Sequence, residues 1–351
     1  MRLFAATLCA TLALGGLTIV PAALAAPANK PLILGHRGAA GHMPEHTRAS
    51  YELAVKMGAD FIEPDLVPTR DGHLIARHEN DITETTDVSI KFPERVTIKM
   101  IDGKRIKGWF TEDFTLAEIK TLRAKERLNF RSHANDGTQE ILTLQEVIDI
   151  AKKATKETGR TIGIYPETKH PTYFRSIGLP LEETLVKILK ENGYDDPKAP
   201  CIIQSFEYQN LQNLRKMIKT PIVFLMEEAK DQPYDFVVKG DPRTYGDLTK
   251  PEELAKIAKF ANGIGPFKRL IVPQNADKTL AAPTTLVADA HKAGLMVHPY
   301  TFRNEASYLA PDYKNDPIAE YLQFFKLGVD GLFSDFSDTA VKARDLYLQG
   351  K

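Results

Sequence analysis

The feature that most constrains the fold is a regular alternation of short apolar runs with longer amphipathic stretches. The runs are nearly continuously apolar, as expected of strands that are covered on both faces. Eight strands are predicted, at Leu32–His36, Asp60–Leu66, Thr161–Glu167, Cys201–Gln204, Pro221–Leu225, Gly263–Ile264, Leu295–His298 and Asp330–Phe333. Eight such strand–helix units favour the α/β class and a closed (β/α)8 TIM barrel, with an open, doubly wound parallel sheet as the alternative.

The stretches around these runs carry the helical pattern. Helices are expected at Thr47–Met57, Leu142–Thr158, Leu181–Asn192, Tyr208–Ile218, Pro251–Phe260, Thr284–Ala293, Ile318–Leu327 and Asp338–Leu348. Glycine closes several of them just before the next strand, at Gly58, Gly193, Gly294 and Gly328. Glycine in these places is typical of a left-handed cap at the end of a helix.

A polar interval at about 80–137 breaks this rhythm. It contains the only tryptophan, Trp109, and a short helical pattern, "TLAEIKTLRAKERL". We predict an insertion between the second and third strand–helix units, folded onto the mouth of the barrel. A disordered loop is the alternative, but the aromatic residues Phe92, Phe110 and Phe114 make it less favourable.

The N-terminus has the pattern of a signal peptide. Arg2 precedes the apolar segment 3–20, and Ala23-Leu24-Ala25 matches a cleavage site between small residues. We predict a signal peptide at 1–25 and one barrel domain at 26–351, exported and soluble. A membrane anchor is the alternative, but the segment is short and rich in Ala and Gly, and Pro21 follows it.

Composition excludes two broad classes of protein. The chain has 46 basic and 46 acidic residues, and cleavage would remove Arg2 and leave a formal charge of −1. A balanced charge argues against a nucleic-acid partner, which basic proteins contact through many phosphates. Cleavage would also remove Cys9 and leave Cys201 alone, so the mature chain would depend on a hydrophobic core and not on disulfides.

Three carboxylates are expected to meet at the carboxyl ends of the strands. Glu63 and Asp65 in "FIEPDL" point to the same side of one strand, and Glu167 ends the next, two residues before Lys169. All strands of a barrel place their carboxyl ends at one face. Carboxylate oxygens that converge there are hard ligands, and they favour Ca²⁺ or Mg²⁺ over zinc. Solvated loop charges are the alternative for each acid taken singly.

Two histidines and an arginine lie at the same predicted face. His36 and Arg37 leave the first strand in a glycine-rich turn, and His78 ends a short return strand at 74–77. Histidine is the usual proton donor and acceptor near neutral pH, and the guanidinium fork matches a phosphate. A packed or surface role is the alternative for either histidine, and His298, at the end of another strand, is the main competitor.

Four motifs in order and spacing resemble the glycerophosphodiester phosphodiesterases. They are "HRGAAGHMPEHT", "EPDLVPTRDGHLIARHE", "IYPETK" and "GVDGLFSDF", and they span the predicted mature chain. The polar interval, with "TDVSIKFPER" and "WFTEDFTLAEIKTL", is similar to the exported bacterial branch of that family. The resemblance implies a (β/α)8 barrel with an inserted segment that hydrolyses diesters such as glycerophosphocholine to sn-glycerol 3-phosphate and an alcohol. The periplasm is the expected location, because the exported branch is typically found there.

The resemblance also implies roles for single residues. It implies His36 and His78 as the acid–base pair, Glu63, Asp65 and Glu167 as ligands of one Ca²⁺ or Mg²⁺, and Arg37, Lys169 and Phe206 as substrate contacts. A cyclic phosphate would form first and then be opened by water. The chain departs from the usual family pattern at His46, Pro64 and Glu79, which leaves open whether His46 adds a supporting contact.

Two other functions remain as alternatives. A phospholipase D-like enzyme acting on lysophospholipids would use the same histidines and carboxylates, but it would need an apolar groove or a membrane-facing patch. A non-catalytic exported binding protein would keep the barrel and bind a small molecule without turnover. The sequence leaves the oligomeric state, the alcohol and the choice between periplasm and secretion open.

Overall fold

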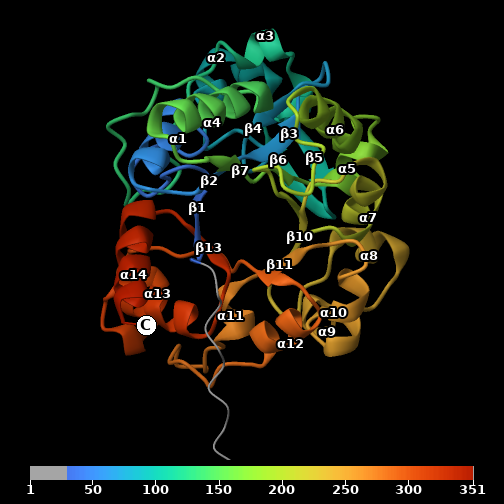
Figure 1. Cartoon of the computed structure of the whole chain (residues 1–351). Coiled ribbons are helices and arrows are strands. Elements are labelled where there is room, and N and C mark those ends of the chain that lie inside the picture. The colour runs from blue at the N-terminus through green and yellow to red at the C-terminus, as the bar shows by residue number, and fades with distance from the viewer. Residues whose placement is uncertain (1–29, 351) are drawn as a thin grey trace, which may run out of the picture.

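A computed structural model describes residues 30–350 of the chain, so the predicted signal peptide at 1–25 lies outside the described residues. Its parallel strands form a ring with helices on the outside, and the chain follows the ring in sequence order (Figure 1). The ring is built from β1 (Leu32–His36), β2 (Phe61–Glu63), β3 (Asp65–Pro68), β7 (Gly163–Ile164), β8 (Glu167–Thr168), β9 (Ile203–Ser205), β10 (Ile222–Met226), β11 (Gly263–Pro266), β12 (Met296–Val297) and β13 (Gly331–Ser334).

The ring closes, which confirms the barrel over the open sheet. One sheet has the order β13-β1-β2-β7 and the other β12-β11-β10-β9-β8-β3-β4. Parallel bridges join them, Ile164 to Cys201 on one side and Phe302 to Ser334 on the other. The second barrel strand divides into β2 and β3 at Pro64, whose missing N–H cannot serve the ladder. The short return strand β4 (Leu74–Ala76) pairs antiparallel with β3, as predicted.

The predicted helices all form. They are α1 (Arg48–Lys56), α4 (Leu144–Thr158), α6 (Leu181–Glu191), α7 (Tyr208–Met217), α10 (Pro251–Ile257), α12 (Leu286–Lys292), α13 (Pro317–Lys326) and α14 (Ser337–Gln349). The glycines predicted to cap them have φ values of 98°, 82°, 79° and 90° at Gly58, Gly193, Gly294 and Gly328, which confirms left-handed ends. Short helices that were not predicted lie between them: α5 (Pro171–Ser176), α8 (Tyr234–Lys239), α9 (Tyr245–Leu248) and α11 (Lys268–Ile271).

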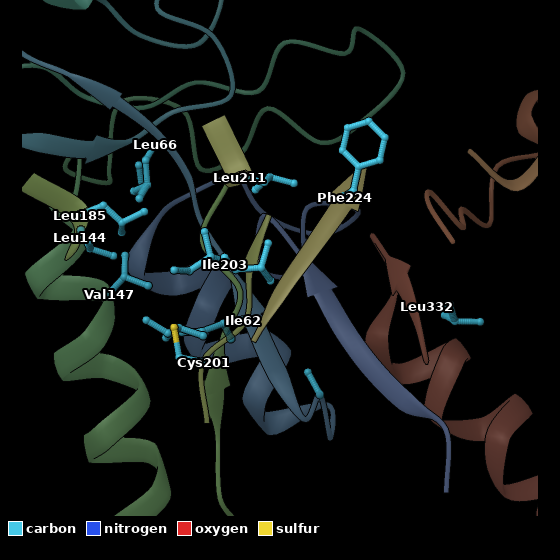
Figure 2. Packing of buried hydrophobic residues seen from close by; sticks show 14 of the residues in the cluster. Ile62, Leu66, Leu144, Val147, Leu185, Cys201, Ile203, Leu211, Phe224 and Leu332 are labelled. Atoms are coloured by element: carbon cyan, nitrogen blue, oxygen red, sulfur yellow. The ribbon is translucent and has the colours of Figure 1, made fainter. Parts of the chain in front are cut away.

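Alternation along the strands sorts side chains into two packed layers. Leu34 points into the barrel and packs with Tyr165 and Phe333, whereas its neighbour Ile33 points out toward the helices. Figure 2 shows the outer layer, where Ile62 and Ile203 of the strands lie among side chains of the surrounding helices. Full burial of such side chains stabilises the fold by about 1.5–3 kcal/mol each.

Residues 80–137 form an ordered set of short elements between β4 and α4. They are α2 (Val88–Lys91), β5 (Thr97–Ile101), β6 (Lys104–Gly108) and α3 (Leu116–Ile119), with 3-10 turns at Pro93–Arg95 and Thr111–Asp113. Phe110 and Phe114 are completely buried, and the indole N–H of Trp109 donates to the carbonyl of Phe92 at 2.6 Å. The aromatic residues therefore anchor the segment. Two further 3-10 turns, Ala306–Tyr308 and Pro311–Tyr313, follow β12.

Within residues 30–350, no helix is both long and apolar enough to cross a membrane.

Candidate active site

The side chains singled out in the sequence gather around one cavity of about 900 Å³ at the carboxyl ends of the strands. Those that line it are His36, Arg37, Glu63, His78, Glu167, Lys169 and Phe206. Asp65 is 1% exposed and lies behind this lining, where it contacts both Arg37 and His46. The strands explain the convergence, because β1 and β2 pair His36 with Glu63 and β3 and β8 pair Asp65 with Glu167.

The three predicted metal ligands form a compact group. Each of Glu63, Asp65 and Glu167 offers one carboxylate oxygen, and these oxygens all lie within 4.8 Å of one another. All three side chains are buried. Three buried carboxylates at such distances repel one another, and an oxygen-binding cation is the usual remedy.

The charge balance of the group also fits a cation. Burial and the neighbouring Asp65 and Glu167 raise the pKa of Glu63 well above its usual value. Burial likewise raises the pKa of Glu167 to about 8, against the opposing charge of Lys169. Burial would also raise the pKa of Asp65, but the hydrogen bond from His46 and the charge of Arg37 hold it well below its usual value. Oxygen Oδ1 of Asp65 has no hydrogen-bond partner within residues 30–350, so it is available to a cation.

Hydrogen bonds from neighbouring strands orient two of these ligands. The backbone N–H of Arg37 donates to Glu63 Oε2 at 2.7 Å, and the Gln204 amide donates to Glu63 Oε1 at 3.0 Å. His46 lies with Nε2 2.9 Å from Asp65 Oδ2, and its Nδ1 lies 2.8 Å from the Tyr51 hydroxyl. The question that the sequence left open is answered: His46 supports Asp65.

His36 is held by a buried ion network. Its Nδ1 lies 2.5 Å from Asp335 Oδ1, and Asp335 Oδ2 accepts from Arg131 at 2.6 Å and from Arg303 at 2.8 Å. Burial lowers the pKa of His36 to about 4, and the charge of Arg37 acts in the same direction while Asp335 opposes it. A lowered pKa favours the neutral form of the ring, which can accept a proton.

His78 has a similar but more open arrangement. Its Nδ1 lies 3.0 Å from Glu79 Oε1, and the two side chains are 29% and 42% exposed. Burial at the cavity wall, then the charges of Arg37 and Lys169, lower the pKa of His78 to about 4. Both histidines thus use Nδ1 for a carboxylate, which leaves Nε2 of each for chemistry.

The predicted substrate contacts bring positive charge and an aromatic face to the cavity. Arg37 has a left-handed backbone, with φ of 55°, and its Nη1 and Nε face Glu45 and Asp65 at 2.9 and 3.3 Å. Lys169 Nζ lies 3.1 Å from Glu167 Oε1 and 5.5 Å from the centre of the Phe206 ring. Two cations at one wall suit an anionic group such as a phosphate.

The main competitor among the histidines lies elsewhere. His298 is completely buried inside the barrel, where its Nδ1 lies 2.9 Å from the Tyr165 hydroxyl, and it does not line the cavity. Asp335 and Gln204 were not predicted as contacts of site residues. Asp335 lies in the motif "GVDGLFSDF", and Gln204 ends the predicted strand Cys201–Gln204. The position of each residue at the carboxyl end of a strand is the feature that could have identified it.

Comparison with known proteins identifies the fold and the family. A glycerophosphodiester phosphodiesterase of Arabidopsis thaliana is 38% identical over 333 residues, covering 91% of this chain and 87% of that protein. The Haemophilus influenzae enzyme of the same name is 31% identical over 337 residues and 89% of each chain.

Solved structures agree in fold. An Oleispira antarctica phosphodiesterase, in complex with the product sn-glycerol-3-phosphate, superposes with a TM-score of 0.61 at 19% identity, over 90% of this chain and 97% of that one. A glycerophosphodiester phosphodiesterase of Agrobacterium tumefaciens has a TM-score of 0.55 at 18% identity, over 89% and 99%. The family model for glycerophosphoryl diester phosphodiesterases matches residues 36–339. The chain therefore belongs to the glycerophosphoryl diester phosphodiesterase family.

Proposed function

We propose that the protein hydrolyses glycerophosphodiesters such as glycerophosphocholine to sn-glycerol 3-phosphate and an alcohol, with the help of one divalent cation. The observation that carries this proposal is one cavity lined by two carboxylate-bound histidines and two cations, with a group of three buried carboxylates at its wall. Family membership and the product bound to the Oleispira antarctica relative support the same chemistry.

The cation site is the carboxylate group Glu63, Asp65 and Glu167. When bound there, Ca²⁺ or Mg²⁺ would supply electrostatic stabilisation of negative charge on the phosphate oxygens. Arg37 and Lys169 would add fixed positive charge and orient the phosphate. Phe206 would pack against the glycerol carbons, since its ring faces the same cavity beside Lys169.

The two histidines divide the proton transfers. One histidine, neutral at Nε2, takes the proton of the glycerol 2-hydroxyl as that oxygen attacks phosphorus. The other acts as an imidazolium, protonated on both nitrogens, and gives its Nε2 proton to the departing alcohol as the P–O bond breaks. In the second step a water molecule gives up a proton and opens the cyclic phosphate, and the released ring oxygen is protonated. The carboxylates on Nδ1, Asp335 for His36 and Glu79 for His78, hold each ring with Nε2 toward the reacting atoms.

The N-terminal pattern supports a proposal for the cellular location. We propose that the protein belongs to the exported bacterial branch and acts in the periplasm after loss of residues 1–25. Osmotic-shock fractionation with mass determination of the mature N-terminus tests this. A full-length chain in the cytoplasmic fraction would contradict it.

A substrate competition tests the activity itself. The purified protein receives glycerophosphocholine and micellar lysophosphatidylcholine in equal amounts, with Ca²⁺ and Mg²⁺ present, and glycerol 3-phosphate, choline and lysophosphatidic acid are measured. We expect glycerol 3-phosphate and choline in equal amounts as the main products. Release of lysophosphatidic acid in excess would favour the phospholipase D-like alternative, and binding of glycerophosphocholine without any product would favour the binding-protein alternative.

A further inference from the structure

His170 is a partly buried titratable group that has no role in the proposed reaction so far. It directly precedes α5, its backbone is left-handed with φ of 46° and ψ of 44°, and its side chain is 16% exposed. Its Nδ1 lies 2.6 Å from Asp102 Oδ2, and its Nε2 lies 2.7 Å from Glu79 Oε2. Both ring nitrogens therefore contact carboxylates.

This geometry identifies the protonation state of the ring. An ionised carboxylate only accepts hydrogen bonds, so each ring nitrogen must carry a proton if both contacts are hydrogen bonds. The ring is then an imidazolium between two anions. Burial lowers the pKa of His170, but the hydrogen bonds and charges of Asp102 and Glu79 outweigh it and raise the pKa to about 9.

Glu79 connects this imidazolium to the proposed catalytic centre. One of its oxygens, Oε2, receives His170, and the other, Oε1, lies 3.0 Å from Nδ1 of His78. A carboxylate held at both oxygens has little freedom to turn. This contact keeps a proton on Nδ1 of His78, so that Nε2 faces the cavity and is the nitrogen that takes up or gives up the catalytic proton.

Asp102 extends the same chain of contacts to the β5–β6 hairpin. It lies in the turn between the two strands, with φ of 46°, and lines the cavity together with Gly103 and Lys104. Figure 1 shows this hairpin beside α5, where the Asp102–His170 contact joins the two. The order of contacts is Asp102, His170, Glu79, His78.

We propose that His170 is a positioning residue, whose imidazolium holds Glu79 on Nδ1 of His78 and fastens the tip of the β5–β6 hairpin at the rim of the cavity. Its effect on catalysis rests on the proposed function, whereas the hydrogen bonds themselves do not. None of the four residues in this series of contacts, Asp102, His170, Glu79 and His78, belongs to the carboxylate group that would hold the cation.

Kinetics of matched variants test the catalytic part. Asn tolerates a left-handed backbone, so His170→Asn and Asp102→Asn should both fold. We expect His170→Asn to lower kcat for glycerophosphocholine about tenfold with little change in KM, and the pair His170→Asn with Glu79→Gln to be no slower than Glu79→Gln alone. The control is His291→Gln, which breaks another His–Asp pair, with Asp330 at 2.8 Å, outside the cavity. Additive losses in the double variant, or an unchanged kcat in His170→Asn, would overturn the catalytic part.

Two measurements decide the geometry without any turnover. Imidazole ¹⁵N spectra of the full chain, assigned with the single variants, should show His170 protonated on both nitrogens at pH 7 and His78 protonated on Nδ1, with the His78 preference lost in His170→Asn. Hydrogen exchange at residues 97–108 should be faster in Asp102→Asn than in the wild type. A neutral His170, or unchanged exchange of the hairpin, contradicts the proposed contacts. An inactive wild type with the expected spectra would instead reject the proposed function alone.

Discussion

The two proposed catalytic histidines are held by the same chemistry, but the cations behind them differ. On the His36 side, Asp335 is 2% exposed and is paired with the permanent charges of Arg131 and Arg303. On the His78 side, Glu79 is 42% exposed and is paired with a titratable group, His170. The two arginines of the first network keep their charge at any pH that the fold tolerates, whereas the second network loses its cation as pH rises and His170 is deprotonated.

The two networks also differ in how far along the chain their parts lie. Glu79 follows His78 directly, so the second carboxylate is a local contact. Asp335 lies 299 residues from His36, and Arg131 lies 204 residues from Asp335. The carboxylate of His36 therefore depends on the closed barrel, whereas the carboxylate of His78 is its neighbour in sequence. The cations behind both carboxylates come from distant parts of the chain, since His170 lies 91 residues from Glu79. We expect substitutions to disturb stability more on the His36 side and pH dependence more on the His78 side.

The largest expected effect comes from removing either histidine. His36→Ala and His78→Ala should each lower kcat for glycerophosphocholine at least ~10²-fold, because each histidine moves a proton in the transition state. Steady-state release of glycerol 3-phosphate measures this, with circular dichroism as the control for folding. Near-normal turnover in either variant would remove that histidine from the mechanism, and would show that the two histidines do not have equivalent catalytic roles.

The next largest effect is a difference in stability between variants of the two carboxylates that contact the histidines, Asp335 and Glu79. Asp335→Asn should cost roughly 3–5 kcal/mol of unfolding free energy, because it leaves Arg131 and Arg303 without their buried partner. Glu79→Gln should cost about 1 kcal/mol or less, since its side chain is half exposed. Urea unfolding of both variants measures the difference. Equal costs would show that the two networks do not differ in burial as described.

A smaller effect is the pH dependence of the stability that His170 contributes, compared with that of Arg131. The folded pKa of His170 is raised to about 9 from 6.5, so its stabilisation is fully present below pH 6.5 and is lost as pH rises through 9. The stability difference between wild type and His170→Asn should therefore shrink by about 1–2 kcal/mol over that range, after allowance for solvent screening at Glu79.

Arg131→Met is the matched variant for this pH test, because the arginine stays charged throughout. Its cost in unfolding free energy should stay constant between pH 6.5 and 9, and differential scanning fluorimetry with urea titrations at several pH values measures both variants. A His170→Asn cost that grows with pH has the wrong sign for an imidazolium and would contradict the assignment.

Much of this fold could be predicted from residue patterns. Continuous apolar runs located every barrel strand, and strand alternation predicted correctly that Glu63 and Asp65 would share a side and approach Glu167. The roles of these residues in catalysis and metal binding stay predictions. The signal peptide at 1–25 and the periplasmic location also stay predictions.

The short helices and the contacts between residues that are distant in sequence could not be predicted from local patterns. The helices α5, α8, α9 and α11 have four to six residues, too few to show a helical period. Asp335 was not predicted as the partner of His36. It follows the last predicted strand, which pairs with the first in the closed barrel, but spacing along the chain does not show which side chains at two strand ends will touch. No role was predicted for His170 either. Its two carboxylate partners are Glu79, after β4, and Asp102, in the β5–β6 turn, and no sequence pattern indicates that these three residues lie together.

The most direct test of the central claim is release of glycerol 3-phosphate from glycerophosphocholine by the purified mature chain, measured untreated, after EDTA, and after separate return of Ca²⁺ and Mg²⁺. Asp65→Asn, which changes a proposed cation ligand that does not line the cavity, runs beside the wild type as the cation-site variant. We expect EDTA to abolish release and one of the two ions to restore it in the wild type, with weaker restoration in Asp65→Asn. Full activity after EDTA, or no release with either ion from a folded chain, would contradict a cation-dependent diesterase centre built on Glu63, Asp65 and Glu167.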